Sequence, residues 1–308
     1  MYYEQIHNNN NEFLTHLNSV MTSNGWVLID NTNNKRVYDG NGVVIIFQLG
    51  FCGSRDGDAS SNSEWSNYRQ IRINVLEEGN YNTNLQNIFL NTTGLDDNDV
   101  YSGWPGFLIE ESKKSKSFIS VNENRFLMVF QQNGVYQSMY AGKYLSYASP
   151  LQHPNPHCYI GNIVNANCLT SGNKESSILR MGSVQGDTEN GDCYVKRWDG
   201  YWNRIRYGSG YGGRFSGIYP FFEGCDREFY PNLDGSYTAI PSVIITDYNS
   251  SDDNSEGYLL GELEGVFGVS GTYNSPENDF TYNLDDYICF PSLRLEYKNM
   301  SYFAIKKA

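Results

Sequence analysis

The feature that most constrains the fold is a change of hydrophobic period near residue 25. Before it, apolar side chains recur every three or four residues, which is the spacing of a one-sided helix, at Phe13, Leu14, Leu17, Val20 and Met21. After it, apolar residues alternate or come in short runs, as in β-strands. We therefore expect one helix over about 11–23, capped by Asn10 or Asn11 and stopped at Asn24-Gly25.

The rest of the chain favours antiparallel β structure with turns rich in Gly, Asn and Asp. Ile71, Ile73 and Val75 alternate with polar residues, which indicates a strand with one face in water. Residues 118–121 and 125–130 flank a polar turn and predict a hairpin. The expected fold class is α+β, mostly antiparallel β, with one N-terminal helix followed by β-sheet and long loops. Further strands are expected at 26–29, 36–38, 43–47, 242–246, 259–269, 287–290 and 302–305.

Prolines between Pro150 and Pro156 mark the expected domain boundary, because proline cannot donate to a strand ladder. We expect an N-terminal α+β domain over 1–149 and a C-terminal β-rich domain with long loops over 150–308. Two long polar segments, Gly50–Asn67 and Cys168–Asp192, match neither pattern. Loops of this length are commonly functional, and in assembly proteins they can act as arms that order on a neighbour.

Composition excludes several classes of protein. A net charge of −13 argues against a general nucleic-acid binder, and 15% aromatic residues argue against a disordered chain. No stretch approaches the roughly 18 apolar residues of a membrane helix, and the start of the chain has no basic and apolar segments of a secretory signal. The 6 cysteines are widely spaced without a CxxC pair, which favours isolated thiols in a reducing cytoplasm.

Two motifs come close to nucleotide and calcium sites without completing them. Gly208–Gly213 matches G-x-G-x-x-G, with Asp234 further on, but the residues that follow lack the helical stripe that would hold a pyrophosphate. Asp252–Gly257 resembles the start of a calcium loop, but Leu263 stands where a bidentate Glu belongs and Glu262 comes one place early. We expect a flexible turn and a solvated acidic turn at these two segments.

A third cluster offers metal ligands in an unfavourable backbone. His153, His157 and Cys158 lie within six residues, but Pro154 and Pro156 forbid the helix that would align two histidines. We expect solvated or stacked loop histidines, no metal and no cofactor.

No catalytic set stands out from the sequence. Gly268-Val269-Ser270-Gly271 lacks the spacing of a nucleophile elbow. Glu262 and Glu264 are expected to project from one wet face of a strand, but a glycosidase pair cannot be chosen from spacing alone. We therefore expect a protein that is not an enzyme.

The candidate binding site is a basic, aromatic run between residues 196 and 214. Arg, Trp and Tyr dominate the energetics of protein interfaces, and a basic patch complements an acidic face on another copy. Ordinary solvated strands and stacking of nucleic-acid bases are the alternatives. The residues expected to make a protein interface are Lys196, Arg197, Trp198, Trp202, Arg204, Arg206, Tyr207, Arg214 and Phe215.

A set of distinctive segments is spread over most of the chain: Ser23–Trp26, Val135–Gly142, Tyr147–Pro156, Tyr159–Gly161, Tyr230–Tyr237, Gly261–Gly271 and Tyr302–Ile305. In this order, and together with the opening helix, they resemble a family of uncharacterised structural proteins of tailed bacteriophages. In that family's pattern an aromatic residue stands at the positions of His153 and Asn155, and a glycine at Asn162.

The resemblance implies a virion component of the tail, baseplate or neck and gives no catalytic residues. We expect a non-enzymatic assembly protein, localised to the virion after assembly in the host cytoplasm, whose partners are other virion proteins and further copies of itself. The 25 tyrosines suit this role because they supply contact area at low rotamer cost. A carbohydrate- or receptor-binding module at the tail tip and an envelope-degrading virion enzyme are the alternatives.

Overall fold

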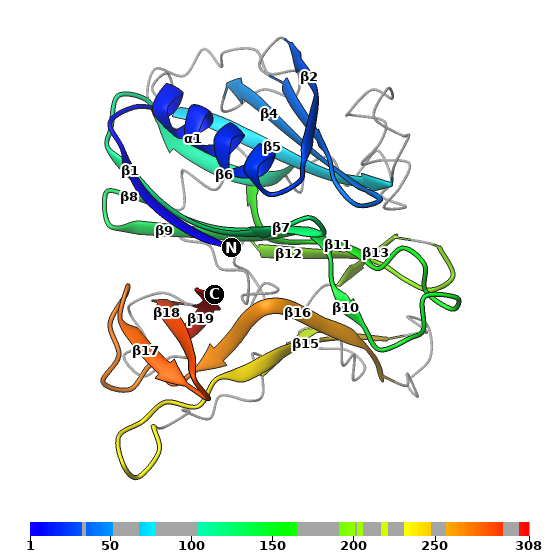
Figure 1. Cartoon of the computed structure of the whole chain (residues 1–308), viewed down its shortest axis with the longest axis vertical. Coiled ribbons are helices and arrows are strands. Elements are labelled where there is room, and N and C mark those ends of the chain that lie inside the picture. The colour runs from blue at the N-terminus through cyan, green and yellow to red at the C-terminus, as the bar shows by residue number, and fades with distance from the viewer. Residues whose placement is uncertain are drawn as a thin grey trace, which may run out of the picture.

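The computed structural model describes residues 1–32, 35–51, 68–77, 104–164, 191–200, 202–205, 217–220, 231–247, 257–291 and 302–307. Within these ranges the chain forms one α-helix and nineteen strands, arranged as two antiparallel sheets (Figure 1). The expected β-rich fold with a single N-terminal helix is confirmed. No helix in this part of the chain is long and apolar enough to cross a membrane.

The helix α1 (Asn10–Ser23) begins and ends through asparagine and glycine. The Asn9 side chain accepts a hydrogen bond from the Glu12 backbone N–H at 3.0 Å, and the Glu12 carboxylate accepts one from the Asn8 backbone N–H at 2.8 Å. Gly25 ends the segment in a left-handed conformation, with a φ of 88°. The helix prediction is confirmed. The cap prediction is wrong. The helix is capped by Asn9, which has the extended backbone that a cap requires, and not by Asn10 or Asn11.

The larger sheet contains twelve strands and folds over itself, so that its two ends lie in different layers (Figure 1). Its strands, in spatial order, are β1 (Tyr2–His7), β7 (Ser115–Asn122), β8 (Arg125–Gln132), β9 (Val135–Lys143), β11 (His157–Val164), β6 (Trp104–Glu110), β5 (Tyr68–Glu77), β4 (Val43–Phe51), β3 (Lys35–Asp39) and β2 (Val27–Thr32). A hairpin of β12 (Gly191–Lys196) and β13 (Trp202–Ile205) adds to β11.

The smaller sheet contains seven strands and lies below the larger one in Figure 1. Its order is β14 (Gly217–Tyr219), β15 (Ile240–Asp247), β16 (Gly257–Val269), β19 (Tyr302–Lys306), β18 (Asp285–Pro291) and β17 (Asp279–Tyr282), with the short β10 (Leu145–Ser146) paired to β16. The molecule thus has an upper layer of α1 and β2–β6, a middle layer around β7–β9, and a lower layer formed by the smaller sheet (Figure 1).

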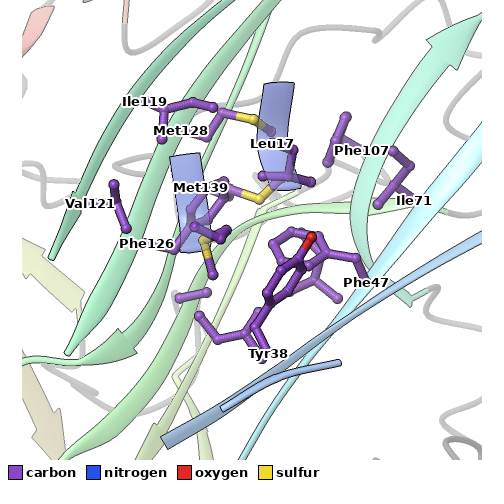
Figure 2. Packing of buried hydrophobic residues seen from close by; sticks show 14 of the residues in the cluster. Leu17, Tyr38, Phe47, Ile71, Phe107, Ile119, Val121, Phe126, Met128 and Met139 are labelled. Carbon is purple, nitrogen blue, oxygen red and sulfur yellow. The ribbon is translucent and has the colours of Figure 1, made fainter. Parts of the chain in front are cut away.

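The middle layer is buried on both faces. On β8, Phe126, Met128 and Phe130 belong to the core cluster shared with α1 and the upper strands (Figure 2). The alternate residues Leu127 and Val129 belong to a second cluster, shared with the smaller sheet. Because successive side chains of a strand point to opposite faces, a strand between two cores must be apolar at nearly every position. This explains the continuous apolar run over residues 126–130.

Two strand predictions have different outcomes. The hairpin predicted around Asn122-Glu123-Asn124 is confirmed, as β7 and β8 pair from Asn122↔Arg125 to Ser115↔Gln132. The wet face predicted next to Ile71, Ile73 and Val75 is wrong at Asn74, which is buried. Alternation in sequence shows which residues share a face, but whether the polar face meets water depends on how the sheet folds over.

The long segments Gly50–Asn67 and Cys168–Asp192 fall almost entirely outside the described residues. The domain division at Pro150 stays a prediction. Strands β11, β12 and β13 follow that position in the chain and belong to the larger sheet, together with strands that precede it.

Burial of the middle layer against the smaller sheet predicts that truncating a side chain on that face destabilises the protein. Leu127→Ala should lower the free energy of unfolding by about 2–5 kcal/mol, because it opens a cavity in the cluster facing the smaller sheet. Leu151→Ala is the matched control, because Leu151 is 98% exposed and should change stability by less than about 0.5 kcal/mol. Chemical denaturation measures both, and equal effects would contradict the two-core arrangement.

Candidate interaction surface

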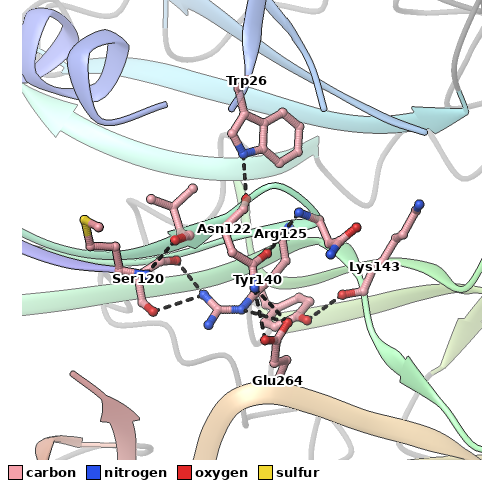
Figure 3. Close-up of polar contacts among 10 residues, drawn as sticks. Trp26, Ser120, Asn122, Arg125, Tyr140, Lys143 and Glu264 are labelled. Atoms are coloured by element: carbon pink, nitrogen blue, oxygen red, sulfur yellow. Dashed lines mark hydrogen bonds and ion pairs between the residues drawn. The ribbon is translucent and has the colours of Figure 1, made fainter. Parts of the chain in front are cut away.

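A bulge in β16 places the Glu264 carboxylate, which belongs to the smaller sheet, next to the middle layer. Between the pairs Pro241↔Phe267 and Val243↔Glu262, β16 contains extra residues that have no partner on β15. Gly265 lies in this bulge with a φ of 79°, a conformation that favours glycine. The bulge turns Glu264 toward the β7–β8 hairpin (Figure 3).

Glu264 is the centre of a polar joint between the layers. Its two carboxylate oxygens each accept from Asn122 Nδ2 at 3.0 Å, and Oε2 lies 3.6 Å from Arg125 Nε. The Arg125 side chain is only 7% exposed, and its Nη1 donates to the Ser120 carbonyl at 2.7 Å. From the upper layer, Trp26 Nε1 donates to the Asn122 carbonyl at 2.7 Å (Figure 3).

The groups of the joint are suited to holding the two layers together. A buried guanidinium needs a compensating charge, and Glu264 supplies it from the opposite sheet. The expectation that Glu262 and Glu264 share one wet face is wrong, because Glu264 is turned into this joint. Glu262 instead accepts a hydrogen bond from the Tyr147 hydroxyl at 2.7 Å.

The histidine cluster is buried, so of the two expected alternatives, solvated or stacked loop histidines, the solvated one is wrong, while His153 is a stacked loop histidine. The ring of His153 lies edge-on to Tyr144 with centroids 5.6 Å apart, and its Nδ1 lies 3.2 Å from Ser146 Oγ. His157 and Cys158 begin β11 and are fully buried. Burial, and to a smaller degree the nearby Lys143 charge, lower the pKa of His157 to about 4. Among the described residues no group of three His, Cys, Asp or Glu side chains is placed to hold a metal ion.

The basic, aromatic run is split by the β12–β13 hairpin. Lys196 and Trp202 face each other as the last ladder pair, and Arg204 stands opposite Tyr194. Trp202 packs partly into the upper core, and Lys196 is buried. The Lys196 carbonyl accepts a hydrogen bond from the Tyr144 hydroxyl at 3.1 Å. Arg206, Tyr207, Arg214 and Phe215 lie outside the described residues.

The exposed part of the candidate site is the turn of this hairpin. Arg197 and Asp199 form an ion pair, and the Arg197 guanidinium lies 6.0 Å from the centre of the Trp198 ring. Trp198 is 37% exposed, and its ring centre lies 5.5 Å from that of Tyr258, the second residue of β16 in the smaller sheet. We call Arg197, Trp198, Asp199 and Tyr258 the hairpin surface. Sequence reasoning missed Tyr258, because no local pattern links residues 198 and 258.

The described surface also carries large apolar side chains at several turns. Leu284 is 99% exposed and has a φ of 68°, next to Asn283 with a φ of 49°. Two left-handed residues define a tight hairpin turn in which glycine is preferred at the second position. The other nearly fully exposed apolar side chains are Leu151, Leu233 and Tyr273.

Comparison with known proteins adds no relative: no family model matches the chain, and no curated protein matches it.

The joint predicts that Glu264 contributes to stability and that the neighbouring Glu262 contributes little. Glu264→Gln should lower the free energy of unfolding by about 2 kcal/mol, because it leaves the buried Arg125 charge uncompensated while part of the Asn122 contact survives. This expected loss of stability is smaller than for a fully buried ion pair, because the Glu264 side chain is 34% exposed. Glu262→Gln is the control and should change stability by less than about 0.5 kcal/mol. Similar losses in both variants would refute the role of the joint.

Buried histidines predict a loss of stability in acid. The pKa of His157 is about 4 in the folded protein and about 6.5 in the unfolded chain. Between these two pH values the unfolded chain binds a proton at this residue and the folded chain does not. Stability should therefore fall as pH drops from 6.5 toward 4, by about 2 kcal/mol between pH 7 and 5 for this residue. In His157→Gln, denaturation curves should show a shallower pH dependence over that range. An unchanged slope would contradict this assignment.

Proposed function

We propose that the chain is a non-enzymatic structural component of a tailed-bacteriophage virion, in its tail, baseplate or neck. It acts through protein–protein contacts with other virion proteins and with further copies of itself. The observation that carries the proposal is that, among the described side chains, different groups serve internal cohesion and outward contact. The polar groups of the joint hold the layers together, while Trp198 on the hairpin surface presents an exposed ring beside an arginine.

The segments that resemble the phage family support the proposal through their place in the fold. Residues 135–142 form most of β9, in the middle layer. Gln137 on this strand donates to the Leu108 carbonyl at 2.7 Å and accepts from the Leu108 N–H at 2.8 Å. A Cβ atom at Gly142 would lie 2.5 Å from the Asn124 carbonyl oxygen. These residues meet requirements of packing, as expected of a pattern that specifies a scaffold.

His153 fits the same view. The family pattern has an aromatic residue at this position, and the His153 ring takes an aromatic place against Tyr144. Its partners are the Tyr144 and Ser146 hydroxyls, which are neutral hydrogen-bonding groups. This arrangement supports a packing role for the segment 147–156.

The hairpin surface is the part of the candidate site that we assign to partner contact. Trp198 presents an exposed aromatic ring beside an arginine, and it is already supported from behind by Tyr258. A supported tryptophan loses little conformational freedom on binding, which is the property of an interface hot spot.

This assignment predicts that Trp198→Ala reduces incorporation into particles. Truncating a hot-spot tryptophan typically costs 2 kcal/mol or more of binding free energy, so occupancy should fall roughly tenfold or more. The measurement is mass-spectrometric copy number in purified particles produced with the variant chain, alongside the melting temperature of the isolated protein. Tyr273→Ala is the control, because it removes an aromatic side chain that is more exposed (92% against 37% for Trp198) from a different turn.

Three outcomes would overturn the proposal. The first is absence of the wild-type chain from purified particles. The second is saturable turnover of a glycan or peptidoglycan substrate by the purified chain, which would favour the enzyme alternative. The third is binding of a glycan that Trp198→Ala abolishes, with a copy number of three per fibre, which would favour a receptor-binding module.

A further inference from the structure

The edge strand β1 is built as a template for another strand. Among the described residues it pairs on one side only, with β7, in six consecutive pairs from Tyr2↔Ser120 to His7↔Ser115. Figure 1 shows it along the margin of the molecule, curving up beside α1. At the opposite end of the sheet, β2 carries a bulge between Leu28 and Asp30, which interrupts its edge. Strand β1 has no bulge, no proline and no lysine, the devices that usually protect an edge.

The hydrogen-bonding direction of β1 can be assigned from its first residue. The Met1 amino group donates to the Val121 carbonyl at 2.8 Å, and the Val121 N–H donates to the Met1 carbonyl at 2.9 Å. Because bonded and non-bonded pairs alternate in an antiparallel ladder, odd-numbered residues of β1 bond to β7. The N–H and C=O groups of Tyr2, Glu4 and Ile6 therefore point away from the sheet.

A second copy of the same strand fits this edge. In a two-fold antiparallel pair, one residue must face its own equivalent. Centring the pair on Gln5 places Glu4 of each chain opposite Ile6 of the other, and both have outward backbone groups. Centring it on Glu4 would place two carboxylates directly opposite each other, which is unfavourable. The Gln5-centred register also covers Ile6, which is 63% exposed.

We propose that β1 pairs antiparallel with β1 of a second copy, in the register centred on Gln5, and joins the two larger sheets into one. The contact is isologous, so it closes as a dimer. This inference names a self-contact of the proposed virion component, and it depends on that proposal only for its biological role.

Charge substitutions at Ile6 test both the pairing and its register. Ile6→Glu faces Lys116 within its own chain, which favours folding, but faces Glu4 of the second copy across the dimer. Ile6→Lys would instead face an opposite charge across the dimer. We expect a dissociation constant at least about tenfold higher for Ile6→Glu than for Ile6→Lys. Sedimentation across micromolar concentrations measures this, and Val27→Glu on the bulged edge, at 61% exposure, is the control.

A cysteine cross-link gives an independent readout. In the proposed register the two Gln5 residues form a non-bonded pair with Cα atoms about 4.5 Å apart, within the range of a disulfide. Gln5→Cys should therefore oxidise to a covalent dimer with an unchanged melting temperature, while Asn31→Cys on β2 should not.

A wild-type chain that stays monomeric, equal dissociation constants for the two Ile6 variants, or no Gln5→Cys dimer would overturn the inference. These failures are separable from failure of the proposed function. A monomer found in particles overturns only the β1 contact. A dimer that forms through β1 but is absent from particles overturns only the virion role.

Discussion

The fold depends on one constraint, which is that the middle layer must satisfy two cores at once. Strands β7, β8 and β9 give alternate side chains to the cluster around α1 and to the cluster facing the smaller sheet. An apolar face is stabilised only when another element covers it, so neither the upper layer nor the smaller sheet is dispensable. The three layers are therefore expected to unfold together, although they come from separate stretches of the chain.

Hydrophobic burial alone would allow the smaller sheet to slide on the middle layer. The polar joint restricts this, because a buried guanidinium must meet its carboxylate at one place. The bulge around Gly265 provides that meeting, and a Cβ atom there would lie 2.8 Å from Arg125 Nη2. The backbone conformation at this position therefore favours glycine, and a side chain there would displace the Arg125 guanidinium. Register between the sheets is set by a few polar groups, and the energy of their association comes from the apolar area.

Local features of the fold could be predicted from the sequence because their causes are local. The stripe from Phe13 to Met21 predicts α1, and a polar turn between two apolar runs predicts the β7–β8 hairpin. The burial of Asn74 and the turn of Glu264 into the joint depend on how sheets fold over each other. The contact of Trp198 with Tyr258 joins residues sixty positions apart, so no spacing rule reveals it. Of the predicted binding residues whose side chains are described, only Trp198 is exposed.

The positions of the tyrosines limit how far composition alone supports an assembly role. Composition alone suggests a surface rich in tyrosine, yet Tyr38, Tyr140 and Tyr144 are buried. Their hydroxyls find partners within the protein: Asn18 Oδ1 at 3.1 Å, the Lys143 carbonyl at 2.6 Å and the Lys196 carbonyl at 3.1 Å, respectively. Buried tyrosine serves a wide β core that must also satisfy polar groups at its margins. Partner recognition therefore falls to a few exposed side chains and to strand edges, where single substitutions have large and separable effects.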